Sequence, residues 1–329
     1  GGWRAEIYET SGSWNLIGTL TPQSPAAHIY SVEYNNNGDR LVTASQDGIA
    51  RTWHRTSQNK LQNLENGHNG WIGTVDFNSD NSLMVATGHQ SRQAILINPS
   101  NGSIIKKYDG TNELLNHVEF SPTDTIIAGL TNNGRLIFWE LNGDTIRTIR
   151  AFDNRYAWSL VGDLKFSNDG QFLYCAGKFG PVKKYNVYTG DSVQVYNHDY
   201  LINWLELSQD NDRMVAASNI WWDEGDKITI WDLNTKDTLQ VPGDIAARLS
   251  PDGWTLLAQD INEWRRTIFW DLSIDPPEAI DSLVSGPGVY MTKDGTTIIT
   301  ITYDAKLLRI YSADDLKLQK SVQIWDHEE

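Results

Sequence analysis

The chain has 329 residues, of which 40% are hydrophobic, and its formal net charge at pH 7 is −15. A chain of this length can bury a large core, while its acidity argues against binding to nucleic acid or insertion at an anionic membrane, since both depend on basic surface. No run of 18 apolar residues predicts a membrane span, and the single cysteine, Cys175, excludes an intrachain disulfide. That cysteine content fits a reducing compartment, so a cytoplasmic location is favoured, with export as the alternative.

The first predicted element is a β-hairpin over residues 3–20. It consists of two runs, Ala5 to Gly12 and Trp14 to Leu20. The hairpin corresponds to the two outer strands of the repeat that follows. Because the chain starts in the middle of a repeat, we expect it to be part of a larger polypeptide or complex.

A short strand that ends in a polar turn recurs seven times after the hairpin. The last apolar residues before these turns are spaced 41 to 46 residues apart: Tyr34, Phe77, Phe120, Phe166, Leu207, Leu249 and Met291. Each interval contains four short runs of alternating polar and apolar residues, joined by Asn, Asp, Gly or Pro, without helical periodicity. The predicted repeats are 29–68, 69–110, 112–152, 157–198, 201–243, 244–284 and 286–325.

A four-stranded unit of this size cannot bury both of its faces alone, and stacking such units in a ring buries them. The sequence therefore predicts an all-β fold, a β-propeller, with residues 1–329 as one domain. An aromatic or apolar residue stands at a second fixed position in every repeat. We expect the tryptophans at this position to lie in the core: Trp53, Trp139, Trp231 and Trp270.

The repeat resembles the WD40 family over practically the whole chain. The Trp-Asp pair typical of the family is intact at Trp231-Asp232 and Trp270-Asp271, its Gly-His pair at Gly67-His68, and its Ser-Pro-Asp-Gly turn at Ser250 to Gly253. This resemblance implies a WD40-like propeller of four-stranded blades and does not identify a ligand. Seven blades are favoured, with the hairpin outside the ring or replacing weak last strands. The alternative is an eighth blade of which only half is present.

The sequence contains no catalytic, cofactor-binding or metal-binding pattern. The histidines are scattered without zinc-ligand spacing, the acidic turns do not continue into a calcium loop, and motifs for nucleotide binding or nucleophilic hydrolysis are absent. We therefore predict a protein that is not an enzyme and needs no cofactor. A propeller enzyme with convergent carboxylates near its channel is a less favoured alternative.

Two neighbouring repeats have enlarged connections between their second and third strands, over residues 219–226 and 260–266. Trp and Arg on loops of a rigid scaffold are typical of binding interfaces. The alternative is that the indole rings fold back over the blade edges. The predicted contact surface comprises Trp221, Trp222, Asp223, Glu224, Glu263, Trp264, Arg265 and Arg266, extended by Trp71 and Trp158.

These features predict a non-catalytic scaffold that binds a protein or peptide. Asp223, Glu224 and Glu263 favour a basic segment as the partner. Carbohydrate recognition is a second hypothesis, because Trp faces flanked by carboxylates also suit sugar rings. A sensor or scaffold segment of a larger multidomain protein is a third.

Overall fold

The computed structural model describes most strands of the chain and part of its connections. The described residues are 5–8, 16–20, 29–34, 40–45, 50–54, 60–64, 72–88, 91–109, 113–152, 162–177, 180–198, 202–218, 227–243, 247–260, 266–284, 288–291, 295–301 and 307–323. All regular secondary structure in these ranges is β-strand, which confirms the predicted all-β class. The same ranges therefore hold no helix that is long and apolar enough to cross a membrane.

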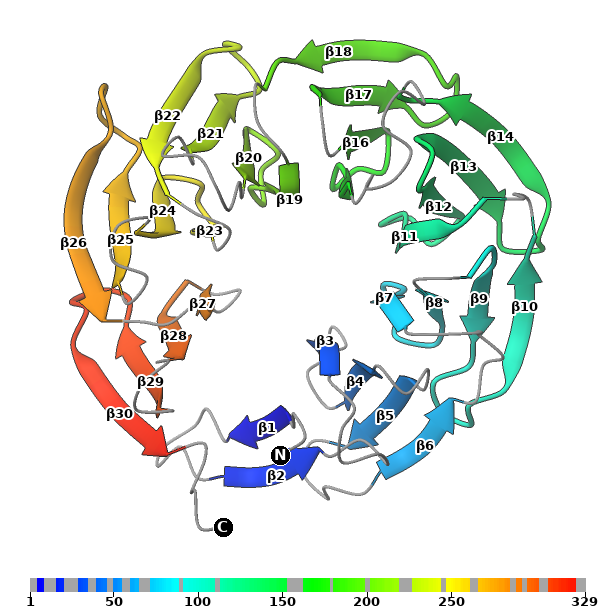
Figure 1. The fold of residues 1–329 in the computed structure, drawn as a ribbon, viewed down its shortest axis with the longest axis horizontal. Coiled ribbons are helices and arrows are strands. Elements are labelled where there is room, and N and C mark those ends of the chain that lie inside the picture. Colours follow the sequence, from blue (N-terminus) through cyan, green and yellow to red (C-terminus); the bar gives the residue numbers. More distant parts are fainter. Residues whose placement is uncertain are drawn as a thin grey trace. The chain divides into compact units, whose positions relative to one another are not determined.

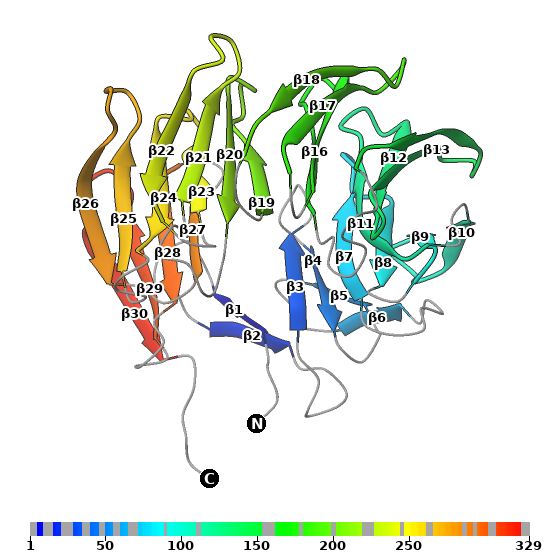
Figure 2. The same cartoon turned by 45° about the horizontal axis from the view of Figure 1, so that its top comes forward.

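The strands form seven four-stranded sheets and one two-stranded sheet (Figure 1). By contacts the chain divides into two compact units, residues 1–175 with 183–194 (unit 1) and residues 176–182 with 195–329 (unit 2). Sheets of four sequential strands are the blades expected of a WD40-like propeller. Figure 2 shows the same order of strands within each sheet from a second direction.

Unit 1 contains the hairpin, three complete sheets and most of a fourth. The strands are β1 (Ala5–Tyr8) and β2 (Leu16–Leu20); β3 (Ile29–Tyr34), β4 (Arg40–Ser45), β5 (Ala50–His54) and β6 (Lys60–Leu64); β7 (Ile72–Phe77), β8 (Met84–Gly88), β9 (Ala94–Ile97) and β10 (Ile104–Tyr108); β11 (Leu115–Phe120), β12 (Ile126–Thr131), β13 (Arg135–Glu140) and β14 (Thr145–Arg150); and β15 (Leu164–Phe166), β16 (Phe172–Ala176), β17 (Val182–Asn186) and β18 (Ser192–Tyr196).

Unit 2 contains the remaining three sheets. Their strands are β19 (Ile202–Leu207), β20 (Arg213–Ser218), β21 (Lys227–Asp232) and β22 (Thr238–Pro242); β23 (Ala247–Leu249), β24 (Thr255–Gln259), β25 (Arg266–Asp271) and β26 (Glu278–Val284); and β27 (Gly288–Met291), β28 (Thr297–Ile301), β29 (Leu307–Ser312) and β30 (Leu318–Gln323).

The N-terminal hairpin forms a sheet of its own, in which β1 pairs antiparallel with β2. The seventh sheet has all four of its strands, β27 to β30, so the hairpin does not replace a last strand there. The choice between seven and eight blades stays a prediction.

Burial follows the position of a strand within its sheet. All six residues of β12 are buried, while β14, the fourth strand of the same sheet, is mostly exposed. A middle strand packs on both faces, so it reads as a continuous apolar run instead of an alternating one. Two of the repeat's tryptophans lie in this core, Trp139 at 1% and Trp231 at 2% exposed. Trp270 is partly buried against it, and the side chain of Trp53 lies outside the described part of the chain.

The acidic turns between first and second strands are held by their own side chains. The Ser167 hydroxyl donates to Asp169 at 2.6 Å, and this hydrogen bond lowers the pKa of the Asp169 carboxyl below its ordinary value. The same bond joins Ser208 to Asp210 at 2.5 Å. The carboxylates of Asp169 and Asp210 therefore help to hold the geometry of their turns.

Candidate functional site

Most residues of the predicted contact surface lie outside the described part of the chain. These are Trp71, Trp158, Trp221, Trp222, Asp223, Glu224, Glu263, Trp264 and Arg265. Arg266 is described as the exposed first residue of β25, where it pairs with Val284. Its carbonyl accepts a hydrogen bond from the amide of Asp260 at 2.9 Å, which closes the base of the enlarged connection. The contact surface itself stays a prediction.

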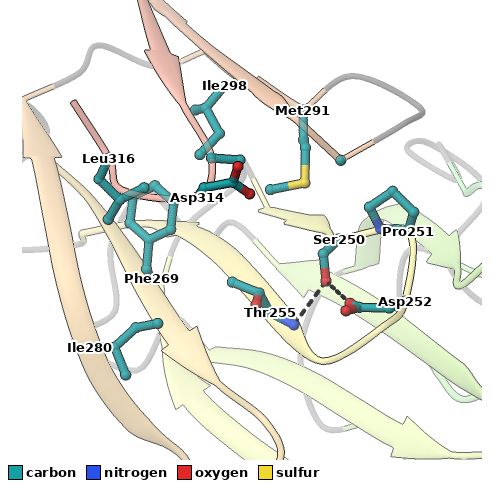
Figure 3. Close-up of a pocket in the computed structure, with 12 residues that line it drawn as sticks. Ser250, Pro251, Asp252, Thr255, Phe269, Ile280, Met291, Ile298, Asp314 and Leu316 are labelled. Carbon is teal, nitrogen blue, oxygen red and sulfur yellow. Dashed lines mark hydrogen bonds between the residues drawn. The ribbon is translucent and has the colours of Figure 1, made fainter. Parts of the chain in front are cut away.

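A cavity of about 370 Å³ lies between sheets β23–β26 and β27–β30, within unit 2 (Figure 3). Two of its lining residues, Phe269 on β25 and Ile298 on β28, belong to the buried core between these sheets. Its lining consists of Ser250, Pro251, Asp252, Thr255, Phe269, Ile280, Met291, Gly295, Ile298, Ala313, Asp314 and Leu316. We refer to this cavity as the pocket. It is concave, and its surface is divided about equally between polar and apolar atoms.

The polar side of the pocket is the Ser-Pro-Asp-Gly turn between β23 and β24. The Ser250 hydroxyl donates to Oδ1 of Asp252 at 2.5 Å and accepts from the Thr255 amide at 2.9 Å (Figure 3). Oδ1 of Asp252 also accepts from the Trp254 amide at 3.0 Å. One carboxylate oxygen of Asp252 is thereby committed to the turn. Among the described residues its other oxygen has no hydrogen-bond donor, so it can accept one from outside.

A β-bulge places an apolar residue at the mouth of the pocket. Phe269 pairs with Asp281 and the next residue, Trp270, pairs with Ala279, so Ile280 has no residue opposite it. A bulge locally re-aims the side chain of the extra residue. Ile280 lines the pocket while 57% of it remains exposed, which is unusual for an isoleucine.

A second exposed apolar side chain lies on the same turn as Asp252. Trp254 is 46% exposed, and its ring stacks on Arg213 with the guanidinium carbon 4.0 Å from the ring centroid. This cation–π contact holds the indole of Trp254 at the surface of the sheet. The end of unit 2 that carries the pocket therefore combines exposed apolar groups with carboxylates.

A polar cluster joins the first strands of three sheets in unit 1. The carboxylate of Asp76 on β7 accepts from the Phe120 amide on β11 at 2.7 Å. Glu119, also on β11, lies 3.5 Å from the ammonium of Lys165 on β15. His117 Nδ1 lies 3.2 Å from Asp163. The first contact satisfies a main-chain amide, that of Phe120, at the edge of its sheet, and the other two join side chains of neighbouring sheets.

Burial away from water is the main cause of the pKa shifts of Asp76, His117 and Glu119 in this cluster. It raises the pKa of the carboxyls of Asp76 and Glu119, although Lys165 opposes the change in both. The same loss of hydration lowers the pKa of His117 to about 4, against the opposite pull of Asp163. Oε2 of Glu119 is buried and has no hydrogen-bond partner among the described residues. At neutral pH His117 is therefore uncharged and the Glu119 carboxyl is largely protonated.

The pocket was not predicted from the sequence. Trp254, which falls outside the fixed position of the repeat, lies on the turn that borders the pocket. The lining residues come from a turn and three strands, β24 to β26, of one repeat and from β27, β28 and two turns of the next. A linear pattern does not reveal that these segments face each other.

Two family models match parts of this chain. The WD domain, G-beta repeat, matches residues 14–54 and 58–96. The anaphase-promoting complex subunit 4 WD40 domain matches residues 118–210.

Similar proteins include eukaryotic translation initiation factor 3 subunit I of Eremothecium gossypii, with 26% identity over 201 residues that cover 57% of this chain and 57% of that protein. The chain thus spans little more than half the length of that relative. Serine-threonine kinase receptor-associated protein of Dictyostelium discoideum is 24% identical over 249 residues, covering 74% of this chain and 79% of that one. The crystal structure of the Myceliophteria thermophila Cps50 (Swd1) beta-propeller domain has a TM-score of 0.65 and 14% identity, covering 87% of this chain and 97% of that one.

Proposed function

This chain belongs to the WD40 repeat family, and we propose that it is a non-catalytic scaffold that binds a protein or a peptide. The observation that carries the proposal is the pocket in unit 2, which has an apolar floor, an exposed isoleucine at its mouth and carboxylates at its rim. Similarity to a protein that is by its name a subunit of a translation factor supports a role within an assembly.

The chemistry of the polar cluster favours a structural role over catalysis. Asp76 is committed to a backbone amide, and Glu119 and His117 each face a charged group of the neighbouring repeat. Cys175 is buried, and loss of hydration raises the pKa of its thiol, which disfavours the nucleophilic thiolate. Within the described ranges no group of His, Cys, Asp or Glu is arranged to hold a metal ion.

The scaffold proposal predicts that the chain is held in an assembly in its own cells. In size-exclusion chromatography of a native extract, it is expected to elute well above its mass of 37.2 kDa. Crosslinking followed by mass spectrometry of that fraction should then identify a protein in constant ratio to the chain. Elution as a free monomer at physiological salt would contradict the proposal.

The enlarged connections remain a second proposed contact surface. Changing Trp221, Trp222 and Trp264 to alanine together is expected to reduce recovery of the crosslinked partner at least tenfold, because buried aromatic anchors dominate interface energies. Tyr188→Ala, which removes an exposed aromatic side chain in unit 1, is the matched control. Undiminished recovery by a folded triple variant would reject this surface.

We also propose a cytoplasmic location. The buried, unpaired Cys175 is compatible with a reducing compartment. Subcellular fractionation tests this, and recovery of the chain with exported proteins would overturn it.

A further inference from the structure

A β-bulge like the one at Ile280 recurs in the fourth strands of other repeats. In sheet β7–β10 the residue without an opposite partner is Ile105, and in sheet β11–β14 it is Ile146. All three isoleucines are exposed, by 49%, 40% and 57% for Ile105, Ile146 and Ile280. The residue that follows each bulge therefore occupies the same place in its repeat, and the three can be compared directly.

In these two sheets of unit 1 the residue after the bulge is a long cation that packs on the next repeat, whereas in sheet β3–β6 it is Gln62. The side chain of Lys106 lies against Gly143 in the turn after β13, so closely that a Cβ on that glycine would collide with it. Arg147 lies in the same way against Gly190 in the turn after β17. The Arg147 guanidinium donates to the carbonyl oxygens of Tyr188 at 2.8 Å and Val187 at 3.3 Å. These side chains fill the groove between fourth strand and turn.

In the repeat that borders the pocket this residue is Asp281. Its short side chain turns back to accept a hydrogen bond from the amide of Ser282 at 2.7 Å. The facing turn differs too, because Leu316 has a φ of 52° at the position where the turn of repeat 4 has Gly190. Leu316 thus adds an apolar wall in place of a glycine, and no long side chain among the described residues is placed across the groove. The pocket lies where Asp281 replaces a long cation and Leu316 replaces a glycine.

We propose that the pocket binds an arginine side chain presented by a segment of a partner protein. The aliphatic part of that arginine would lie on Phe269, Ile280 and Leu316, as the stems of long basic residues do on apolar surface. Its guanidinium would meet the turn that corresponds to Val187 and Tyr188, which in this repeat consists of Ala313 and Asp314. The partner would supply from outside the contact that Arg147 makes within the chain. This inference rests on the proposed scaffold function and deepens it.

The charges around the pocket agree with a cationic occupant. Asp252 and Asp314 both line it and are exposed, and no ion pair or hydrogen-bond donor among the described residues engages the carboxylate of Asp314. The nearby cation Lys317 is paired with Asp315, with Nζ 2.6 Å from Oδ2. Carboxylate oxygens beside the apolar side chains of the pocket suit the planar, multiply donating guanidinium better than the compact ammonium of lysine.

Asp281→Arg tests whether the groove accepts this side chain. The variant is expected to complete the contact from within and raise Tm by about 2 °C, the shift that a net gain of one hydrogen bond gives in a chain of this size. Asp191→Arg makes the same charge change at an exposed site in unit 1 and controls for net charge. A Tm that falls in Asp281→Arg but not in Asp191→Arg would overturn the equivalence of the two grooves.

Methyl NMR of the whole chain measures occupancy with defined probes. Titration with acetyl-arginine methylamide is expected to shift the methyl signals of Ile280 and Met291 with a Kd in the millimolar range, about −4 kcal/mol by the standard conversion. Acetyl-norleucine methylamide, which keeps the apolar stem and lacks the cation, should bind about tenfold more weakly. Asp314→Asn should weaken only the arginine probe, and Asp281→Arg should abolish its effect. Equal shifts by both probes, or none at about 50 mM arginine probe, would overturn the proposal.

Native size-exclusion of Asp281→Arg separates this inference from the scaffold function. Loss of the partner, with the fold retained, supports the pocket as its docking site. A complex that persists in Asp281→Arg overturns the pocket while leaving the scaffold proposal intact. Absence of a complex already in the wild type contradicts the scaffold function itself.

Discussion

Gly129→Ala is expected to lower the free energy of unfolding by about 2–3 kcal/mol, at the upper end of the range for overpacking a core. A Cβ on Gly129 would lie 2.7 Å from two carbons of the Trp139 ring and 2.9 Å from the Leu115 side chain. Trp139 is 1% exposed and tightly packed, so its ring cannot move aside without opening the core between sheets β7–β10 and β11–β14. Thermal and urea unfolding of the purified chain measure this loss.

The equivalent position in another repeat provides the control. Gly129 pairs with Val118, and in sheet β19–β22 the corresponding residue paired with Leu205 is Ala216. Ala216→Gly is expected to cost about 1 kcal/mol, from backbone entropy and a lost methyl group. In the Gly129→Ala background, Trp139→Leu should destabilise less than in the wild type, because removing the ring removes the clash. Additive losses would show that the ring is not the obstacle.

Lys165→Met is expected to destabilise the chain by about 2 kcal/mol at pH 9, where the carboxyls of Asp76 and Glu119 are ionised. This is less than the ~3–5 kcal/mol of a fully buried pair because a third of Lys165 is exposed. The methionine keeps the apolar stem and removes the ammonium that lies 3.5 Å from Glu119. Lys165 also opposes the raised pKa of Asp76, so two carboxyls lose their counterion. Chemical unfolding at several pH values measures the loss.

The pH dependence of this loss has a definite sign. The pKa of Glu119 is raised in the folded state, so the carboxyl's contribution to stability is complete below its ordinary value of 4.5 and is lost as pH rises through the raised value. Removing Lys165 raises the folded pKa further, so the difference between wild type and Lys165→Met should widen from pH 6 to pH 9. Glu119→Gln has no charge to compensate, and in that background the effect of Lys165→Met should shrink. A difference independent of pH would show that Lys165 acts through packing alone.

The fold was predictable because its signal is local and repeated. Each strand is a few residues long, and Ser167, Asp169 and Gly170 form a turn from bonds within five residues. Repetition of such turns identifies four-stranded units. Because one such unit cannot bury both of its faces alone, the units must pack against each other. Trp139 and Trp231 were predicted to be core residues from their periodic place alone, and both are buried.

The predicted binding surface could be proposed from the sequence, whereas the pocket could not, because its lining residues lie far apart along the chain. Trp221, Trp222 and Trp264 were singled out because they interrupt a regular pattern, and an interruption shows where a loop is enlarged but not what it contacts. Arg266, the one member of that surface within the described ranges, pairs at the start of β25 and is exposed. Its position is compatible with the predicted surface without testing it.

The amino-acid order alone was sufficient for the class of fold, the four-stranded repeat and the core position of Trp139 and Trp231, since each follows from a pattern that recurs along the chain. The pocket required three-dimensional facts. One is the register of β25 and β26, which makes Ile280 a bulge residue and Asp281 the counterpart of Arg147. The other is the packing of that strand against a turn some 35 residues later, where Leu316 stands in place of glycine. A missing side chain leaves a space only between the two segments that it would have joined, and their proximity is a property of the folded chain.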